Sequence, residues 1–294
     1  MFNQLSALKN CLAPAKLNLF LHVTGRRADG YHLLQSVFQL LDYGDTLDFT
    51  LRQDGRINRL NPLSGVAEHE DLVVRAARLL QSQAPRLGVD IALTKRLPMG
   101  GGLGGGSSDA ATTLIALNHL WQLGLSREQL MQLGLKLGAD VPFFLFGRNA
   151  FAEGVGEELQ AVNTPECWYV VIEPGVMVPT PTIFSAHDLT RDTKPVTIAD
   201  FSSSQTSCFG KNDLQAVAAR LYPPIQAALD WLSAYGAAKM TGSGACVFCA
   251  MPDPISAQQV VAEAMAAFPQ QWKAWSAKAL MQHPMAAYVD DNIS

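Results

Sequence analysis

The chain has 294 residues, of which 48% are hydrophobic and 16% are charged, and its formal net charge at pH 7 is −4. This length predicts about two domains, and the well-mixed composition excludes a disordered chain. The acidic balance offers no broad basic surface for nucleic acid, and no run reaches the roughly 18 apolar residues of a membrane span. Small-molecule partners are therefore expected.

Two strands are predicted in the first third of the chain. In residues 15–25 (AKLNLFLHVTG), apolar residues alternate with more polar ones, which is the spacing of a strand with one apolar face. The polar stretch GRRADGYH then turns the chain. The same alternation occurs in residues 88–98 (GVDIALTKRLP), where Pro98 ends the strand.

A glycine run follows the second strand directly. Residues 96–111 read RLPMGGGLGGGSSDAA, with six glycines within seven positions. Apolar residues then recur at helical spacing through residues 110–121, so a helix is predicted to begin at the serines, with Ser107 or Ser108 as its N-cap. A flexible linker is not expected between a strand and a capped helix, so the loop is predicted to be structured.

Two known glycine motifs fit this run poorly. Gly100, Gly102 and Gly105 satisfy GxGxxG, but any glycine-rich run does so, and Leu125 stands where the dinucleotide fingerprint expects an acid. The P-loop motif GxxxxGK[ST] fails because Ser107 occupies the lysine position. Both motifs share backbone N–H groups that approach an anion at a helix N-terminus. The run is therefore predicted to bind phosphate, rather than only to form a tight strand-to-helix turn.

Phosphoryl transfer would need a carboxylate near the acceptor and a cation near the developing charge. Asp140 offers the carboxylate, in the turn after a helix that a capping box of Ser126 and Gln129 opens. Lys16, at the mouth of the first strand, offers the cation. From the residues alone, Asp140 could equally be an Asx-turn residue and Lys16 an exposed strand end. The role of Asp109 stays open, since a carboxylate suits the helix dipole but repels phosphate unless Mg²⁺ or its orientation intervenes.

The C-terminal part is predicted to contain two strands, two helices and a long exposed loop. A strand is predicted in YVVIEP, and amphipathic helices in IQAALDWLSAYG and ISAQQVVAEAMAAF. The polar residues 188–213 are predicted to form the exposed loop. The stretch TGSG at residues 241–244 precedes the second strand, and it could approach a second anion, pack on the glycine run or form a plain turn.

The cysteines favour a reducing cytoplasm, because they are scattered and odd in number. The N-terminus also lacks the apolar core of a secretory signal. A CxxC lies in the apolar strand ACVFCAM, where alternation points its two thiols to opposite faces, so both are predicted to be buried and no metal site is predicted. The five cysteines are Cys11, Cys167, Cys208, Cys246 and Cys249.

Four stretches resemble a known superfamily. APAKLNLFLHV, LPMGGGLGGGSSDAA, LGADVPFF and TGSGACVF occur in this order and resemble the GHMP kinases, most closely the 4-diphosphocytidyl-2-C-methyl-D-erythritol kinase family. GRRADGYH and the insertion GLGGGSS point to this family over its mevalonate and homoserine relatives. The resemblance spans nearly the whole chain. It implies an α/β (α+β) protein with an N-terminal ATP-binding domain like ribosomal S5 domain 2, residues 1–163, and a ferredoxin-like C-terminal domain, residues 164–294.

The resemblance also implies an activity, which is ATP-dependent phosphorylation of the 2-hydroxyl of 4-diphosphocytidyl-2-C-methyl-D-erythritol, in the methylerythritol phosphate route to isopentenyl diphosphate. ATP would bind with Mg²⁺, to a cytoplasmic monomer or homodimer without nucleic-acid or membrane partners. Asp140 would accept the hydroxyl proton, while Lys16 would orient that hydroxyl and keep Asp140 ionised. The ATP site would comprise Lys95, Pro98, Met99, Gly100, Gly101, Gly102, Leu103, Gly104, Gly105, Gly106, Ser107 and Ser108.

The family's cytidine pocket corresponds to Tyr31 and His32, with Phe184 on the other side of the base and Asn18 near the erythritol. Aromatic rings can sandwich a base, and a histidine can hydrogen-bond its edge. From the residues alone, the two aromatic residues could be core and His32 a loop histidine. At the adenine pocket, relatives often have Asn-Leu, whereas this chain has Asp71 before Leu72, and an aspartate accepts but does not donate.

Three alternatives to this kinase activity are considered. The first is a GHMP kinase that acts on another small alcohol. The second is a nucleotide-binding protein without catalytic activity. The third is a dinucleotide oxidoreductase, for which the glycine run supplies the weak match to GxGxxG.

Overall fold

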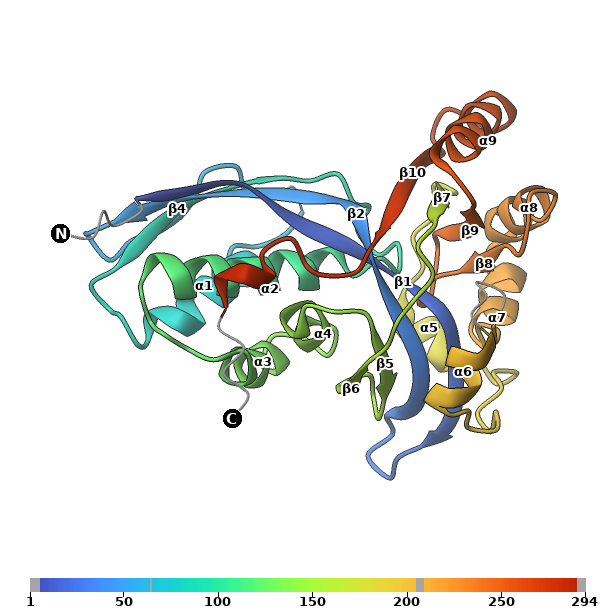
Figure 1. Ribbon diagram of the computed structural model, residues 1–294, viewed down its shortest axis with the longest axis horizontal. Coiled ribbons are helices and arrows are strands. Elements are labelled where there is room, and N and C mark those ends of the chain that lie inside the picture. Colours follow the sequence, from blue (N-terminus) through green and yellow to red (C-terminus); the bar gives the residue numbers. More distant parts are fainter. Residues whose placement is uncertain (1–5, 64, 205–208, 290–294) are drawn as a thin grey trace.

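The computed structural model describes residues 6–63, 65–204 and 209–289, and its strands form one mixed sheet (Figure 1). The order along the sheet is β3-β4-β2-β10-β7-β9-β8, while β1 and β5 also pair with β2, and β6 pairs with β5. The strands are β1 (Ala7–Arg26), β2 (His32–Arg52), β3 (Ile57–Arg59), β4 (Gly88–Thr94), β5 (Ala150–Glu153), β6 (Glu158–Ala161), β7 (Trp168–Glu173), β8 (Lys239–Met240), β9 (Val247–Met251) and β10 (Lys273–Leu280).

Most of the helices lie in two groups beside the sheet. The first four lie on one side of the long strands, and α8 and α9 lie at the end of the molecule opposite the N-terminus (Figure 1). The helices are α1 (Leu72–Gln81), α2 (Gly105–Leu120), α3 (Arg127–Leu135), α4 (Val141–Phe146), α5 (Thr180–Phe184), α6 (Ile198–Ser204), α7 (Gln215–Leu221), α8 (Pro223–Leu232) and α9 (Pro254–Ala267), with a 3-10 turn, η1, at Ala286–Tyr288. In the part of the chain that the structure describes, no helix has the length and apolar character to cross a membrane.

The long hairpin of β1 and β2 joins the two halves of the molecule. The strands pair antiparallel along almost their whole length, and GRRADGYH forms the turn between them. Residues 13–23 of β1 are buried without interruption, because other elements cover both of its faces. The predicted strand at 15–25 covers only the C-terminal part of β1, and Lys16 is buried rather than an exposed strand end.

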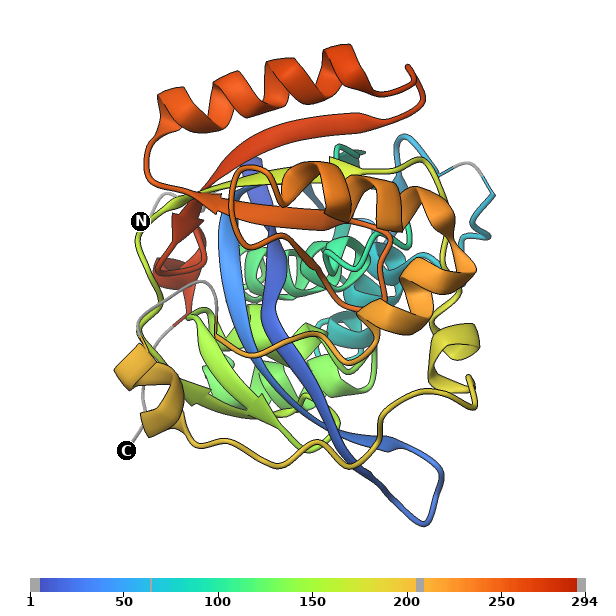
Figure 2. The ribbon, with the colours of Figure 1, turned by 90° about the vertical axis from the view of Figure 1, so that its right-hand side faces the viewer.

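The N-terminal half packs α1 to α4 against β1, β2 and β4 around one apolar core. A second core lies between the C-terminal strands and helices α7, α8 and α9, and Figure 2 shows α9 beside β10. β10 pairs with both β7 and β2, and Met285 and Val289 then enter the N-terminal core. The expected boundary at residues 163/164 falls in the connection from β6 to β7 and stays a prediction.

The predicted C-terminal elements are confirmed as β7, β9, α8 and α9, and Ser126 with Gln129 forms the capping box of α3. Cys249 is buried in the second core, and Cys246 is buried in a third apolar core to which β1, β7 and β10 contribute, as the opposite faces of the two thiols predict. Cys208 lies outside the described residues.

Two expectations are wrong. Helix α2 begins at Gly105, with Gly104 and not a serine at the N-cap, so it starts three or four residues earlier than expected; Gly104 can adopt the left-handed backbone (φ +71°) found at this position. The polar stretch 188–213 is not simply an exposed loop. It contains α6 and buries Phe201 and Asp213, whose carboxylate accepts a hydrogen bond from the backbone of Val23 in β1 at 2.8 Å.

Candidate active site

The glycine run and the stretch TGSG pack against each other. Gly102 has φ +77°, and a Cβ there would lie 2.2 Å from the carbonyl oxygen of Thr241. The hydroxyl of Thr241 donates to the carbonyl of Gly102 at 3.2 Å, and the backbone N–H of Cys246 donates to that of Gly101 at 3.2 Å. Of the three interpretations open for TGSG, packing on the glycine run is the one observed.

One cavity, which we call the loop cavity, lies along the glycine run. It is lined by Pro98–Ser107, by Lys95 and Asp109, and by the first residues of α1 with the segment before it. All the predicted phosphate-binding residues except one therefore share a single hollow. The exception is Ser108, which is fully buried within the first turn of α2.

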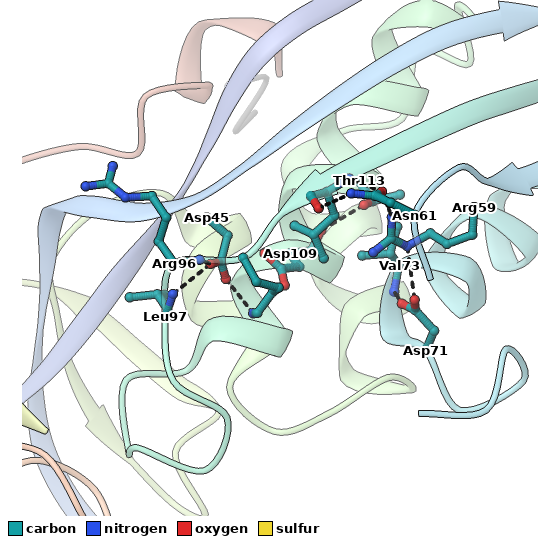
Figure 3. A network of polar contacts seen from close by, with 11 residues as sticks. Asp45, Arg59, Asn61, Asp71, Val73, Arg96, Leu97, Asp109 and Thr113 are labelled. Carbon is teal, nitrogen blue, oxygen red and sulfur yellow. Dashed lines mark hydrogen bonds and ion pairs between the residues drawn. The ribbon is translucent and has the colours of Figure 1, made fainter. Parts of the chain in front are cut away.

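Lys95 lies between the buried side chains of Asp45 and Asp109 at the wall of the loop cavity. Figure 3 shows these two aspartates near each other. The Lys95 ammonium is 2.5 Å from Asp45 Oδ2 and 3.0 Å from Asp109 Oδ2. Asp45 also accepts the backbone N–H groups of Arg96 and Leu97, at 2.5 and 2.9 Å, so it is the better stabilised anion. Burial raises the pKa of Asp109 to about 8 against the opposing pull of Lys95. Asp109 thus turns toward Lys95 as part of a buried cluster.

Asp71 lies at the other end of the loop cavity, and both of its carboxylate oxygens already have partners (Figure 3). Oδ1 caps α1 by accepting the backbone N–H of Val73 at 2.8 Å, and Oδ2 accepts Nε of Arg59 at 3.1 Å. Arg59 also donates to Asn61 at 2.8 Å. Sequence reasoning missed Arg59 and Asn61, because β3, which ends at Arg59, is too short to give a periodic signal.

A second hollow, the central cavity, contains Lys16 and Asp140. Nζ of Lys16 is 3.8 Å from Oδ2 of Asp140. The Lys16 side chain is 5% exposed and that of Asp140 39%, so the carboxylate reaches the cavity while the ammonium is held inside the protein. Burial lowers the pKa of Lys16, and Asp140 partly opposes that shift. Asp140 stands at the N-cap position of α4 without capping it, so its carboxylate is not used as an Asx-type cap.

Asn18 organises the wall of the central cavity. Its Oδ1 accepts from Nζ of Lys16 at 2.6 Å and from the backbone N–H of Gly242 at 3.0 Å. Its Nδ2 donates to the hydroxyl of Ser36 at 2.8 Å. The amide therefore fixes Lys16 relative to the C-terminal glycine stretch, in addition to lining the cavity.

A third hollow, the aromatic cavity, is lined by Tyr31, His32 and Phe184. Tyr31 is 66% exposed, so it is not a core residue. The rings of His32 and Phe184 lie with centroids 4.9 Å apart and planes 33° apart. Nε2 of His32 accepts a hydrogen bond from Nε of Arg191 at 3.1 Å. Sequence reasoning missed Arg191 because it assigned that stretch to an exposed loop.

The three cavities adjoin one another. Gly100, Gly102 and Gly104 line both the loop cavity and the central cavity, while Asp140 and Phe184 line both the central and the aromatic cavity. The central cavity, which Lys16 and Asp140 line, thus shares residues with both of the other cavities.

Comparison with known proteins identifies the fold. Residues 71–148 match the GHMP kinases N terminal domain, and residues 197–270 match the GHMP kinases C terminal domain. A homoserine kinase from Cytophaga hutchinsonii shares the fold at 18% identity, with a TM-score of 0.71 over 96% of this chain and 98% of its own. The fold is that of a GHMP kinase, and the expected two-domain α/β fold is confirmed.

Relatives with higher sequence identity identify the family within the GHMP kinases. A 4-diphosphocytidyl-2-C-methyl-D-erythritol kinase from Herminiimonas arsenicoxydans is 68% identical, and one from Janthinobacterium sp. (strain Marseille) is 65% identical, each over 95% of this chain and 97% of its own. A crystal structure of a 4-(cytidine 5'-diphospho)-2C-methyl-D-erythritol kinase matches with 34% identity and a TM-score of 0.77, over 91% of this chain and 98% of that one. The chain belongs to the 4-diphosphocytidyl-2-C-methyl-D-erythritol kinase family.

Proposed function

We propose that this protein transfers the γ-phosphoryl group of ATP to the 2-hydroxyl of 4-diphosphocytidyl-2-C-methyl-D-erythritol, giving the 2-phosphate and ADP. This is a step of the methylerythritol phosphate route to isopentenyl diphosphate. The observation that carries the proposal is the order of the three adjoining cavities, with Lys16 and Asp140 in the middle one. Such an order suits a donor phosphate on one side and a cytidine on the other.

In this proposal Asp140 is the general base. Its carboxylate is partly exposed in the central cavity and does not cap α4, so it is free to accept the proton of the 2-hydroxyl. Lys16 orients that hydroxyl and stabilises the ionised form of Asp140. Asn18, which holds Nζ of Lys16 at 2.6 Å, keeps the ammonium in place beside the erythritol. A positioned base of this kind contributes roughly 10² to 10⁴ in rate.

The glycine run is proposed to hold the ATP phosphates. Glycine brings backbone N–H groups close to an anion, and the N-terminus of α2 adds the positive end of a 16-residue helix. Lys95 lines the same cavity, but its ammonium is already engaged by the buried side chains of Asp45 and Asp109. The backbone and the helix are therefore proposed as the main phosphate ligands.

Mg²⁺ is proposed to arrive with ATP. Among the residues that the structure describes, no group of three or more His, Cys, Asp or Glu side chains is placed to hold a metal ion. The donor set around the loop cavity thus does not form a protein cage, and Mg²⁺ commonly binds through substrate phosphates and water. Bound in that way, it would neutralise part of the phosphate charge.

Tyr31, His32 and Phe184 are proposed to hold the cytosine ring. The tilted pair of His32 and Phe184 and the exposed ring of Tyr31 line one cavity, which offers stacking surfaces and a polar edge.

We further propose a cytoplasmic location, which the free thiols of Cys11 and Cys167 favour, and a division into domains at residues 1–163 and 164–294. A monomer and a homodimer are both compatible with this site.

A coupled assay of ADP release tests the function directly. Purified protein with MgATP and 4-diphosphocytidyl-2-C-methyl-D-erythritol should release ADP, and ³¹P NMR should show a new phosphomonoester on the erythritol. Homoserine and mevalonate serve as alternative acceptors. Release with either of these but not with the cytidyl substrate would favour another GHMP kinase activity. ATP binding without release for any acceptor would favour a non-catalytic protein.

A further inference from the structure

Arg191 lies behind the aromatic cavity and contacts both of its sides. It belongs to the segment after α5, and its guanidinium donates to Nε2 of His32 at 3.1 Å. Nη2 of the same side chain donates to the carbonyl oxygens of Phe184 at 3.0 Å and Ala186 at 2.7 Å. Nη1 donates to the carbonyl of Leu189 at 3.0 Å. One side chain therefore connects the start of β2 to the end of α5.

These contacts decide the protonation of His32. An arginine side chain only donates hydrogen bonds, so the Nε2 atom that faces it must be an acceptor without a hydrogen. A neutral imidazole with a free lone pair on Nε2 carries its hydrogen on Nδ1. Arg191 therefore selects the Nδ1–H tautomer.

The surrounding charges keep the imidazole neutral. Burial lowers the pKa of His32, and the positive charges of Arg191 and of Arg26 on β1 lower it further. Phe184, which packs on the ring from α5, carries no charge. Asp29, in the turn between β1 and β2, lines the same cavity. The histidine thus offers one fixed N–H donor, which suits the acceptor atoms N3 and O2 of cytosine.

We propose that Arg191 is a positioning residue for nucleobase binding, which fixes the tautomer of His32 and its placement against Phe184. This proposal rests on the function proposed above, since it assumes that the aromatic cavity binds the cytosine. Arg191 itself does not line the cavity, so it acts through the two residues that do. Its loss should weaken binding of the cytidyl substrate and leave the ATP side of the site unchanged.

The ¹⁵N shifts of the His32 side chain in ligand-free protein test the first half of the proposal. In the wild type, the Nδ1–H tautomer is expected. In Arg191→Gln, the population of His32 should move toward the Nε2–H tautomer. The pKa of His32 should rise, because the positive charge of Arg191, which lowers this pKa, is removed. A wild-type His32 in the Nε2–H tautomer would overturn the proposal. This measurement needs neither substrate nor activity, so its outcome is separate from that of the kinase assay.

Steady-state kinetics test the second half. Arg191→Gln should raise KM for the cytidyl substrate about tenfold, the effect of losing one hydrogen bond to a charged group. KM for ATP and kcat should stay within twofold. Arg220→Gln is the matched control, because Arg220 pairs with exposed Asp188 at 2.9 Å and does not line the aromatic cavity. An unchanged KM for the cytidyl substrate in Arg191→Gln would overturn the positioning role, whereas wild-type protein without activity would instead overturn the proposed function.

Discussion

Nζ of Lys16 lies 3.8 Å from Oδ2 of Asp140, and the two partners differ in their access to solvent. The lysine is buried in β1 and held by Asn18, whereas the carboxylate stands at the start of α4 and reaches the cavity. The ammonium is therefore a fixed charge beside a carboxylate that a substrate can approach. This asymmetry favours Asp140 as the proton acceptor and Lys16 as the group that orients.

Asp140→Asn should lower kcat by about 10² to 10⁴, because an amide cannot accept the hydroxyl proton. KM for ATP should stay within twofold, since the glycine run is unchanged. Initial rates with saturating MgATP and cytidyl substrate check the first expectation, and nucleotide titration checks the second. Asp230→Asn, on the exposed face of α8, is the control and should keep full activity. Normal turnover of the Asp140 variant would remove the general-base assignment.

The cluster of Lys95, Asp45 and Asp109 should make stability depend on pH. Burial raises the pKa of Asp109 from 3.8 to about 8. Between these values the folded protein holds a proton that the unfolded chain has lost. The free energy of unfolding should therefore fall as pH rises from about 4 to about 8, by at most about 1.4 kcal/mol per pH unit for this group.

Asp109→Asn isolates this contribution, because an amide of the same shape does not titrate. Urea unfolding of both proteins at pH 5 and pH 8 gives four free energies. The wild type should lose more stability than the variant between the two pH values. Subtracting the pH dependence of the variant from that of the wild type removes the contribution of the histidines, which both proteins contain. Equal pH dependence would mean that Asp109 is ionised across this range beside Lys95.

Phe184→Ala should weaken the cytidyl substrate specifically. An aromatic ring that stacks on a base contributes about 1–3 kcal/mol, so KM for this substrate should rise about 5- to 150-fold. KM for ATP should be unaffected, because Phe184 does not line the loop cavity. Phe268→Ala is a matched control, since Phe268 packs on Trp231 and Trp272 away from the three cavities. Parallel changes in both KM values would indicate general disruption of the fold.

The sequence predicts those parts of the molecule that local periodicity records. The C-terminal part of β1, helix α2 after the glycine run, and helices α8 and α9 follow from apolar spacing alone. β2 is not predicted, because residues 35–41 are all buried and therefore lack the alternation of buried and exposed positions that indicates a strand. Helix α6 is not predicted within its polar surroundings.

The candidate site likewise contains residues that the local sequence predicts and residues that it does not. The glycine run is predicted from its own composition and setting, whereas Asp140 and Lys16 are candidates from their chemistry whose roles rest on the resemblance to the kinase family. Contacts between distant segments have no local signal, and examples are Arg191 with His32 and Arg59 with Asp71. They arise only when the chain folds, so sequence reasoning placed Arg191 in an exposed loop and left Arg59 unnoticed.

Gly102→Ala tests whether the glycine run depends on its contact with the stretch 241–244. At φ +77°, an alanine costs about 1–2 kcal/mol, and its Cβ would lie 2.2 Å from the carbonyl oxygen of Thr241, a backbone atom that cannot rotate away. The two loops should separate, so unfolding free energy should fall by more than this backbone cost alone, and KM for ATP should rise. Gly138→Ala is the control, because its nearest atoms lie 3.7 and 3.8 Å away and its φ is not positive. Its stability should change by less than about 0.5 kcal/mol. If the two variants were equally stable and bound ATP equally well, contact with residues 241–244 would have no part in holding the phosphate loop.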